Sequence, residues 1–363
     1  MTTTRIEVRD SLADLASSWD ALVAKQPIAS PFLRSWWLEG VAGPRPRFVL
    51  VVDDGKLIGG VPLEEHRRMG MSRLQFIGSR NLAADHLDLV AAPGHETTVV
   101  DSLAGWFGRR GTRLFDLGGL VPSSRLSKTL PGTVHLEPQA IAPWSPLPRT
   151  FDEYMSGRPP ALLSTLRKRG KRLTRAGATY HAVEVAGLDQ ALLDLRRLHG
   201  GRWGKESAFL PEFDRFSAAA RVGVERGEMR GHVLAVDGIV IAISFCFQVA
   251  GVVSFYQSGR DLDRQWNGAG TVLKAMVIES ACKAGFRAID LLRGPEPYKR
   301  EWADESRAVV RARAARGLAG RLALSSYLAL RRSPLRSLAQ RGRAVARRSG
   351  RRRAVGDPVR AET

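Results

Sequence analysis

The chain has 363 residues, enough for two domains of ordinary size. Hydrophobic residues make up 44% and charged residues 25% of it, a globular composition that excludes wholesale disorder. The formal net charge is +20, but residues 307–363 hold sixteen arginines against two acids and account for +14 of it. The charge therefore predicts a basic tail, and not a chain that binds nucleic acid throughout.

Cysteine usage and hydropathy narrow the class of protein further. Cys246 and Cys282 each lie in an apolar run, which is typical of buried thiols in a reducing compartment. Neither stands at metal-ligand spacing from a histidine or another cysteine, so we expect no metal. The N-terminus has no apolar stretch of signal-peptide length, and no window approaches 18 uncharged apolar residues. We expect a soluble, cytoplasmic protein, and attachment to the inner face of a membrane stays open.

The first predicted domain, residues 1–149, has an α/β pattern. Two β-rich runs, Arg47–Asp53 and Lys56–Leu63, flank Asp54-Gly55, which is a strong signal for a hairpin turn. The other predicted elements are helices at Leu12–Lys25, Phe32–Val41 and Thr97–Gly111 and strands at Leu74–Gly78 and Arg113–Leu117. The proline-rich stretch Pro122–Arg149 is predicted as an extended connector.

The second predicted domain, residues 150–306, repeats this order of elements. It begins with a basic helix at Ala161–Ala176, and a second hairpin signal stands at Asp237-Gly238. The predicted strands are Thr179–Val185, Gly231–Val236, Ile239–Val249, Val252–Ser258 and Arg287–Leu291, and the further helices are Leu188–Trp203, Glu212–Arg226 and Gly268–Ala284. The runs VLVVDDGKLIGGVP and VLAVDGIVIAISF of the two hairpins align over a dozen residues. We therefore predict two related α/β (α+β) domains, each a mixed, mostly antiparallel sheet with flanking helices, and a basic helical or disordered tail at 307–363.

The loop before the predicted helix Gly268–Ala284 carries the clearest chemical signal. Its residues fit a Q-x-x-G-x-G pattern, and the candidates for ligand binding are Gln265, Asn267, Gly268, Ala269, Gly270 and Thr271. Glycines let the backbone approach an anion closely, and the free N–H groups and dipole of a helix start favour phosphate oxygens. The pattern alone is weak in a chain with 36 glycines, but its place after three strands and before a long helix favours a diphosphate site.

Further motifs surround this loop. They are Tyr256, Ser258, Gly259, Arg260 and Asp261 before it, Asp290 after it, then Arg293, Gly294, Glu296, Tyr298, Lys299 and Trp302, with Arg202-Trp203 upstream. Together they resemble the GNAT acyltransferases, most closely the BioF2-like or CelD-like acetyltransferase domain, a relative of the Fem-type transferases. In the first half Phe32, Trp36, the Asp54–Leu63 hairpin and Asp85-His86-Leu87-Asp88 are similar to the same subgroup. The resemblance covers about residues 10–305 and implies tandem GNAT-like domains, with acetyl-CoA or a longer acyl-CoA bound by the second.

Acyl transfer to an amine needs a base for the ammonium proton and an acid for the departing thiolate. Asp290 and Glu296 are the candidate bases and Tyr298 the candidate acid, because they cluster where the last predicted strand opens into a loop, at a strand end where α/β folds place ligands. A surface network of ion pairs around a turn is the competing interpretation. Candidates for substrate binding are Asp85, His86, Trp203, Tyr256, Arg293 and Lys299. The alternative for His86 is a loop residue whose hydrogen bonds are all made within the protein. The alternative for Trp203 and Tyr256 is a place in the hydrophobic core.

Two basic segments predict anionic partners. Residues 167–175 hold six basic side chains, which suit the 3′-phosphate of coenzyme A, a tRNA or an acidic glycan or lipid, or form a merely solvated face. Leu318–Leu330 is apolar and flanked by arginines, as in helices that lie on an anionic membrane, and a disordered basic tail is the alternative.

These features predict an acyl-CoA-dependent N-acyltransferase. The amine acceptor, by the resemblance, is a small molecule or a glycan- or lipid-linked precursor of the cell envelope or a polysaccharide, such as an amino sugar. A Fem-like transferase that uses aminoacyl-tRNA is the first alternative, and under it the basic helix would contact RNA by sequence-independent charge. The second alternative is a non-catalytic scaffold for envelope biosynthesis.

Overall fold

The protein is described by a computed structural model that covers residues 4–68, 70–109, 111–294 and 296–332. In the first half the helices are α1 (Ala16–Ala24), α2 (Ser35–Val41), α3 (Glu96–Phe107) and α4 (Leu126–Thr129). The strands of this half are β1 (Arg5–Arg9), β2 (Pro46–Asp53), β3 (Lys56–Arg68), β4 (Met71–Phe76), β5 (Val90–Ala91), β6 (Arg113–Leu120) and β7 (His135–Pro146).

The second half repeats the hairpin, third strand, helix and closing strand of the first. Its helices are α5 (Phe151–Ser156), α6 (Pro160–Arg175), α7 (Leu188–Trp203), α8 (Phe213–Glu225), α9 (Ala269–Lys283) and α10 (Leu318–Arg332). Its strands are β8 (Thr179–Ala182), β9 (Met229–Val236), β10 (Ile239–Val249), β11 (Val252–Arg260), β12 (Ala288–Asp290) and β13 (Glu305–Arg316).

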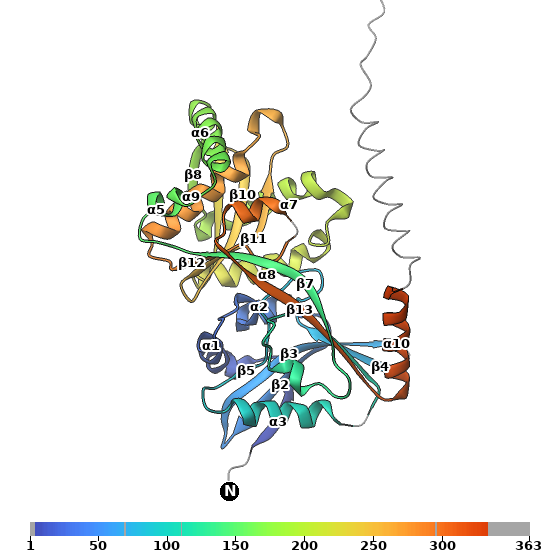
Figure 1. The fold of residues 1–363 in the computed structure, drawn as a ribbon. Coiled ribbons are helices and arrows are strands. Elements are labelled where there is room, and N and C mark those ends of the chain that lie inside the picture. Colours follow the sequence, from blue (N-terminus) through green and yellow to red (C-terminus); the bar gives the residue numbers. More distant parts are fainter. Residues whose placement is uncertain (1–3, 69, 110, 295, 333–363) are drawn as a thin grey trace, which may run out of the picture.

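The strands of both halves join one mixed sheet. Its order is β1-β2-β3-β4-β6-β13-β7-β12-β11-β10-β9-β8, with β5 paired to β3 off this path. In each half the antiparallel hairpin is followed by a parallel pair, β4 with β6 and β11 with β12. Figure 1 shows β7 and β13 running side by side from one half to the other. The predicted α/β (α+β) class with two similar units is confirmed, although the units share a sheet.

Strands β7 and β13 connect the halves because each pairs with a strand of the other. β7, from the chain's first half, ends beside β12, where Trp144 lies opposite Asp290. β13, near the end of the described chain, lies between β7 and β6, and its pairing with β6 ends with Arg316 opposite Arg113. The proline-rich stretch is therefore extended, as predicted, but part of it is a strand of the sheet and not a free connector. The prediction that the tail begins at residue 307 is wrong for residues 307–316, which form most of β13.

Arginines of β13 explain why this basic segment lies inside the protein. Asp116 on β6 is buried, and it accepts hydrogen bonds from Arg311 Nε at 2.5 Å and from Arg73. Arg313 lies 3.1 Å from the same carboxylate. Burial alone would raise the pKa of Asp116, but the bonds and charge of Arg311 and Arg73 lower it to about 2. Part of the positive charge that the sequence assigned to a tail therefore stabilises the centre of the sheet.

Helix α10 follows β13 and covers the predicted apolar segment 318–330. Leu324 is buried, but Leu318, Leu322 and Leu330 are 77%, 60% and 67% exposed. None of the described helices is long and apolar enough to cross a bilayer. Contact of this helix with a membrane surface stays a prediction, and the tail from residue 333 onward lies outside the described residues.

Candidate active site

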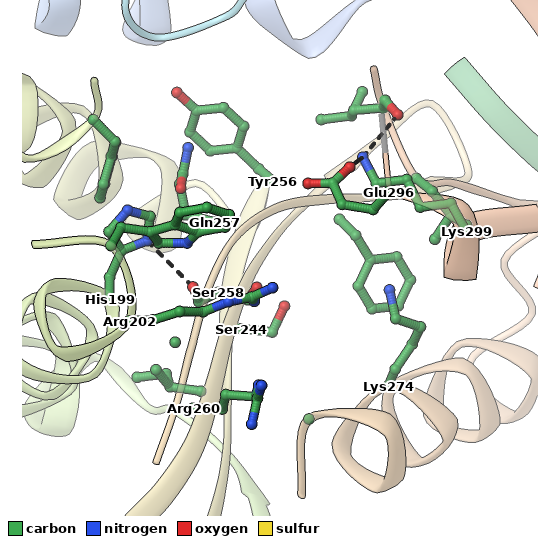
Figure 2. A pocket seen from close by; sticks show the side chains of 18 of the residues that line it. His199, Arg202, Ser244, Tyr256, Gln257, Ser258, Arg260, Lys274, Glu296 and Lys299 are labelled. Carbon is green, nitrogen blue, oxygen red and sulfur yellow. Dashed lines mark hydrogen bonds and ion pairs between the residues drawn. The ribbon is translucent and has the colours of Figure 1, made fainter. Parts of the chain in front are cut away.

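A cavity of about 600 Å³ opens in the second half where two strands of the sheet diverge. β12 pairs with β11 only at Val252–Ser254, and it ends at Asp290 while β11 continues to Arg260. The second part of β11 lines one wall of the cavity, and the chain after β12 lines the other. Figure 2 shows the polar groups that converge here, from β11, α7, α9 and the segment 296–299.

The predicted diphosphate loop lies at one end of this cavity. Gly268, at the N-cap of α9, has φ +95°, a conformation that favours glycine, and its carbonyl accepts from the amides of Thr271 and Val272, both at 3.0 Å. The amides of Ala269 and Gly270 precede these first helical bonds, so they belong to the orphan donors of a helix start. Of the six predicted residues, Asn267, Gly268, Gly270 and Thr271 line the cavity.

The other two predicted loop residues have different roles. Gln265 hydrogen-bonds to Asp263 with its backbone and side-chain nitrogens, both at 3.0 Å, and does not line the cavity. Ala269 is buried in the core beneath α9. The geometry therefore does not support a direct role of the Gln265 or Ala269 side chain in ligand binding.

Basic side chains surround the loop. From α6, Arg172 donates to the Asn267 carbonyl, and a Cβ at Gly268 would lie 2.7 Å from Arg169 Cγ. From β11, the half-buried Arg260 lies beside Gly270, and burial together with nearby Arg202 lowers its pKa. The helix start and the arginines together give a positive field that suits a phosphate or diphosphate.

The segment after β12 contributes Glu296, Tyr298 and Lys299 to the opposite wall. Lys299 is buried, and its Nζ donates to the carbonyls of Leu292 at 3.2 Å and Arg293 at 3.0 Å. Its Nζ also lies 3.3 Å from Glu296 Oε2, an ion pair without hydrogen-bond geometry. Tyr298 is 39% exposed, and burial of its hydroxyl with the charge of Glu296 raises its pKa. Two of the three predicted catalytic residues, Glu296 and Tyr298, therefore face the cavity.

Asp290, the third predicted catalytic residue, does not line the cavity. Its Oδ2 is 3.0 Å from His86 Nε2 and 3.2 Å from Arg307 Nη1, and its Oδ1 accepts from the Leu292 amide at 2.7 Å. Burial alone would raise its pKa, but the charge and hydrogen bond of His86 lower it. With both oxygens occupied and the side chain buried, Asp290 has the surroundings of a structural carboxylate, and the predicted role as a base has no support in this position.

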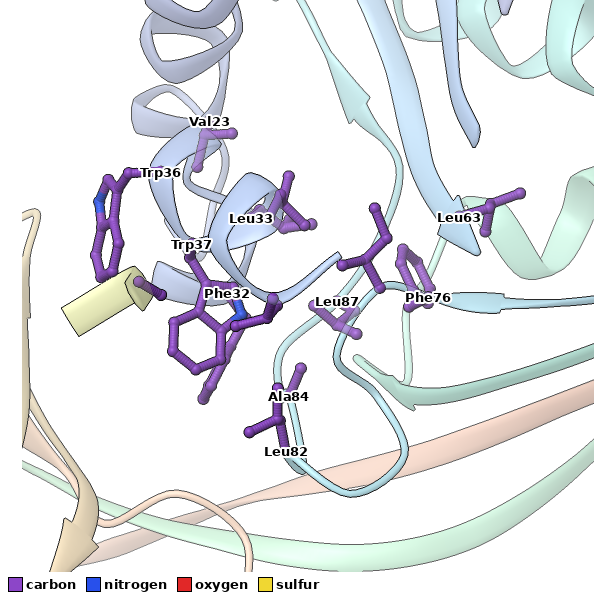
Figure 3. Close-up of a cluster of buried hydrophobic side chains, with 14 of the residues drawn as sticks. Val23, Phe32, Leu33, Trp36, Trp37, Leu63, Phe76, Leu82, Ala84 and Leu87 are labelled. Carbon is purple, nitrogen blue, oxygen red and sulfur yellow. The ribbon is translucent and has the colours of Figure 1, made fainter. Parts of the chain in front are cut away.

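The Asp85-His86 pair lies on a loop of the first half that enters the second. Leu82, Ala84 and Leu87 of this loop pack beside Phe32 and Trp37 (Figure 3). Asp85 is buried, lies 3.0 Å from Arg293 Nε and accepts from the Arg293 amide at 2.7 Å. Burial raises the pKa of Asp85, and its neighbours include Arg293 and His86.

The predicted substrate-binding residues divide accordingly. Asp85, Trp203, Tyr256, Arg293 and Lys299 line the cavity, whereas His86 bonds to Asp290 behind it. Trp203, the last residue of α7, is 40% exposed under the guanidinium of Arg202. The hydroxyl of Tyr256 donates to the Leu82 carbonyl at 2.8 Å, and its ring packs against Phe32 and Trp37, so it serves mainly as core.

His199 and Lys274 are among the cavity residues that sequence reasoning missed. His199 bonds to the Ser258 carbonyl at 3.3 Å and to Ser207 Oγ at 3.0 Å, and burial lowers its pKa. Lys274 is the one charged side chain in the first three turns of α9, among apolar neighbours. A lone lysine among the apolar residues of this helix was the available signal.

Comparison with known proteins agrees with this geometry. Residues 161–300 match the family model described as an acetyltransferase (GNAT) domain. This part of the chain is therefore similar to a GNAT domain. No protein of curated function matches the sequence. The predicted relation to the GNAT acyltransferases is confirmed, and the matched span contains α6, α7, β11, the α9 loop and the 296–299 segment.

Solved structures share the fold over most of the chain. The C-terminal domain of a protein assigned as a lysylphosphatidylglycerol synthetase from Agrobacterium fabrum has a TM-score of 0.55 at 15% identity, covering 88% of this chain and 97% of that one. FemX has a TM-score of 0.61 at 10% identity, covering 82% and 95%. L-PGS from Bacillus licheniformis has a TM-score of 0.54 at 12% identity, covering 86% and 96%. At these identities the likeness shows the fold alone.

Proposed function

We propose that this GNAT-fold protein is an acyl-CoA-dependent N-acyltransferase. The observation that carries the proposal is the start of α9, where Gly268, Gly270 and Thr271 face a cavity at the fork between β11 and β12, with Arg260 beside them. The pyrophosphate of coenzyme A would accept hydrogen bonds from the first amides of α9. The pantetheine arm would then extend into the cavity along β11, whose edge beyond Ser254 is not paired by β12.

The thioester would lie between β11 and the 296–299 segment. Tyr298 would protonate the leaving thiolate, because a tyrosine hydroxyl is protonated at neutral pH and this one faces the cavity. The acceptor would enter beside Arg202, at the side of the cavity away from the 296–299 segment. For its class we retain the amine of an amino sugar or of another envelope or polysaccharide precursor, which rests on the family resemblance.

The test is calorimetric binding of CoA and acetyl-CoA to the wild-type protein and two glycine variants. Gly268→Ala would strain the backbone at φ +95° and bring a methyl group against Arg169, so we expect at least a tenfold loss of CoA affinity. Gly285→Ala is the matched control, because Gly285 also has positive φ and follows the other end of α9, where no atom lies within 4 Å of the added Cβ. Failure of the wild-type protein to bind either compound would contradict the proposal.

The Fem-like alternative rests on the exposed face of α6. Arg167, Lys168, Lys171 and Arg175 point into solvent, as a surface that contacts phosphates of RNA would require. Filter binding of bulk tRNA between 50 and 300 mM salt separates the two functions. Steep salt dependence with submicromolar affinity at low salt, and no binding of CoA, would favour the aminoacyl-tRNA donor. A protein that binds neither would fit the scaffold.

A further inference from the structure

The side chain of Lys274 projects from α9 into the cavity between two aromatic rings. Its Nζ lies 4.7 Å from the ring centroid of Phe255 on β11 and 4.9 Å from that of Tyr298 on the opposite wall. Figure 2 shows Lys274 on the same side of the cavity as Glu296 and Lys299. Lys274 therefore reaches the region where the proposed thioester and acceptor would meet.

The charges around Lys274 differ from those around its neighbour Lys299. Lys299 has two carbonyl acceptors and the carboxylate of Glu296. Among the described residues, Lys274 Nζ has neither a hydrogen-bond acceptor nor a carboxylate within ion-pair distance. The ionisable groups that face it are Lys299, Glu296, Tyr298, and Cys246 on β10.

This environment makes the neutral amine accessible. Burial and the positive charge of Lys299 lower the pKa of Lys274 to about 8, whereas Cys246, Glu296 and the faces of the two aromatic rings act in the other direction. A lysine with this pKa is about one-tenth neutral at pH 7, and its basicity is close to that of an α-amino group. General bases work best with a pKa near the operating pH.

We propose that neutral Lys274 accepts the ammonium proton of the acceptor, an inference that rests on the proposed acyl transfer. The freed nitrogen lone pair attacks the thioester carbonyl carbon, the C–N bond forms, and the C–S bond breaks with its electron pair on sulfur. The second nitrogen proton reaches that thiolate through the Tyr298 hydroxyl. The products are the amide, free coenzyme A thiol and protonated Lys274, which returns its proton to solvent.

The other candidate bases in the site are worse matched to this step. Asp290 is occupied by His86, Arg307 and a backbone amide. His199 uses both ring nitrogens, one on the Ser258 carbonyl and one on Ser207. Glu296 is an ion-pair partner of Lys299, and a paired carboxylate is a weak base for an ammonium group.

Competitive acetylation tests the basicity of Lys274 without knowledge of the acceptor. The full chain is labelled with trace acetic anhydride between pH 6 and 11, and the Lys274 and Lys283 peptides are quantified by mass spectrometry. Lys283, exposed on the same helix and paired with Glu279 at 2.6 Å, is the internal reference, and the pairing raises its pKa. We expect Lys274 to titrate near pH 8, well below Lys283, and CoA to protect it. Titration of Lys274 together with Lys283 would overturn the proposal.

Acyl transfer tests the proton step itself. Thiol release from acetyl-CoA is measured with glucosamine, whose amine is largely protonated at neutral pH, and with hydroxylamine, which is neutral there. We expect Lys274→Met and Lys274→Arg both to lose about 10²–10⁴-fold in rate with glucosamine and much less with hydroxylamine. Rescue by the arginine variant, or equal losses with both acceptors, would assign an electrostatic or structural role instead. CoA affinity and Tm of both variants report their folding. Absence of CoA binding by the wild-type protein would refute the proposed function, whereas the acetylation result bears on Lys274 alone.

Discussion

Three segments distant in sequence meet at the carboxylate of Asp290. His86 comes from the first half, Arg307 from β13, and the Leu292 amide from the segment that leads to the cavity. His86 and Asp290 are 3% and 4% exposed in their side chains. A buried pair of this kind contributes little net stability over an apolar pair, but removal of one partner leaves an uncompensated charge. The cluster therefore holds the two halves together beside the active site without taking part in the proposed chemistry.

Asp290→Asn should accordingly affect stability. Loss of the carboxylate leaves His86 and Arg307 without their shared partner, and we expect the free energy of unfolding to fall by about 3–5 kcal/mol. Urea titration measures it, and Asp189→Asn, which removes an exposed ion pair with Arg221, is the control that should change it by less than about 1 kcal/mol. An Asp290→Asn protein of wild-type stability that has lost acyl transfer would restore the catalytic interpretation.

The same cluster predicts how stability depends on pH. Burial alone would lower the pKa of His86, but Asp290 and Asp85 raise it above its ordinary value near 6.5. A raised folded-state pKa stabilises the protein fully below the unfolded value, and this contribution is lost as pH rises through the folded value. Asp85, whose pKa is also raised, acts in the same direction. Urea unfolding from pH 6 to 9 should therefore show a decline that His86→Gln flattens, and parallel curves would contradict the assignment.

Residues whose role is local could be predicted, and those whose role needs the topology could not. Gly268 follows from the chemistry of a helix start, and Glu296 and Tyr298 from their place after the last strand of the GNAT-like unit. The sequence around Asp290 does not indicate that His86, 204 positions away, bonds to it. The pairing depends on entry of the 82–89 loop from the other half, which only the assembled sheet reveals.

At the scale of elements, the basic residues of helix α6 differ in the direction of their side chains. Arg169 and Arg172 are turned toward the α9 loop, whereas Lys168 is exposed. We expect Arg172→Ala to weaken CoA binding about tenfold, or ~1.4 kcal/mol, with a smaller effect at high salt. Lys168→Ala, an equal change of charge on the same helix, should change the affinity less than twofold. Equal losses in calorimetry would mean that α6 acts only through its overall field.

The hairpins were predictable because the residue types in their turns favour the positive φ angles that such turns need. Asp54 and Gly55 have φ +45° and +76°, and Asp237 and Gly238 have +49° and +77°, as two-residue hairpin turns require. Strands β7 and β13 lack such a signal. β7 contains Pro138 and Pro143, which cannot donate to a ladder, and pairing with β13 shifts register next to Pro138. β13 alternates arginine with small residues, and its strand character comes from partners distant in sequence.

At the scale of the whole molecule, the exchanged strands join the two halves into one sheet. β13 pairs with β6 of the first half and with β7, which in turn pairs with β12 of the second. Apolar contacts also join the two halves, since the ring centroid of Phe32 in the first half lies 5.0 Å from that of Phe247 in the second. Arg34 of the first half also pairs with Glu228. The predicted domain limits at residues 149 and 306 therefore do not coincide with separable sheets.

This arrangement predicts which C-terminal truncations the protein tolerates. A chain ending at Asp304 lacks β13, so β6 and β7 lose their common partner, and the buried Asp116 loses Arg311 and Arg313. A buried carboxylate left with Arg73 alone, beside two open strand edges, should prevent folding, and we expect aggregation on expression. A chain ending at Arg332 keeps β13 and α10, and should remain soluble, unfold at the temperature of the full chain and bind CoA with the same affinity.

The outcome of the truncations decides between two views of the arginine-rich C-terminus. If the chain ending at Asp304 folds cooperatively and binds CoA, residues from 305 onward form an appendage, and the exchanged strands do not determine the fold. If only the longer chain folds, the first four arginines after residue 306 are structural, because Arg307, Arg311, Arg313 and Arg316 all bond within the sheet or its loops. A role for positive charge in membrane or RNA contact would then have to come from residues beyond β13.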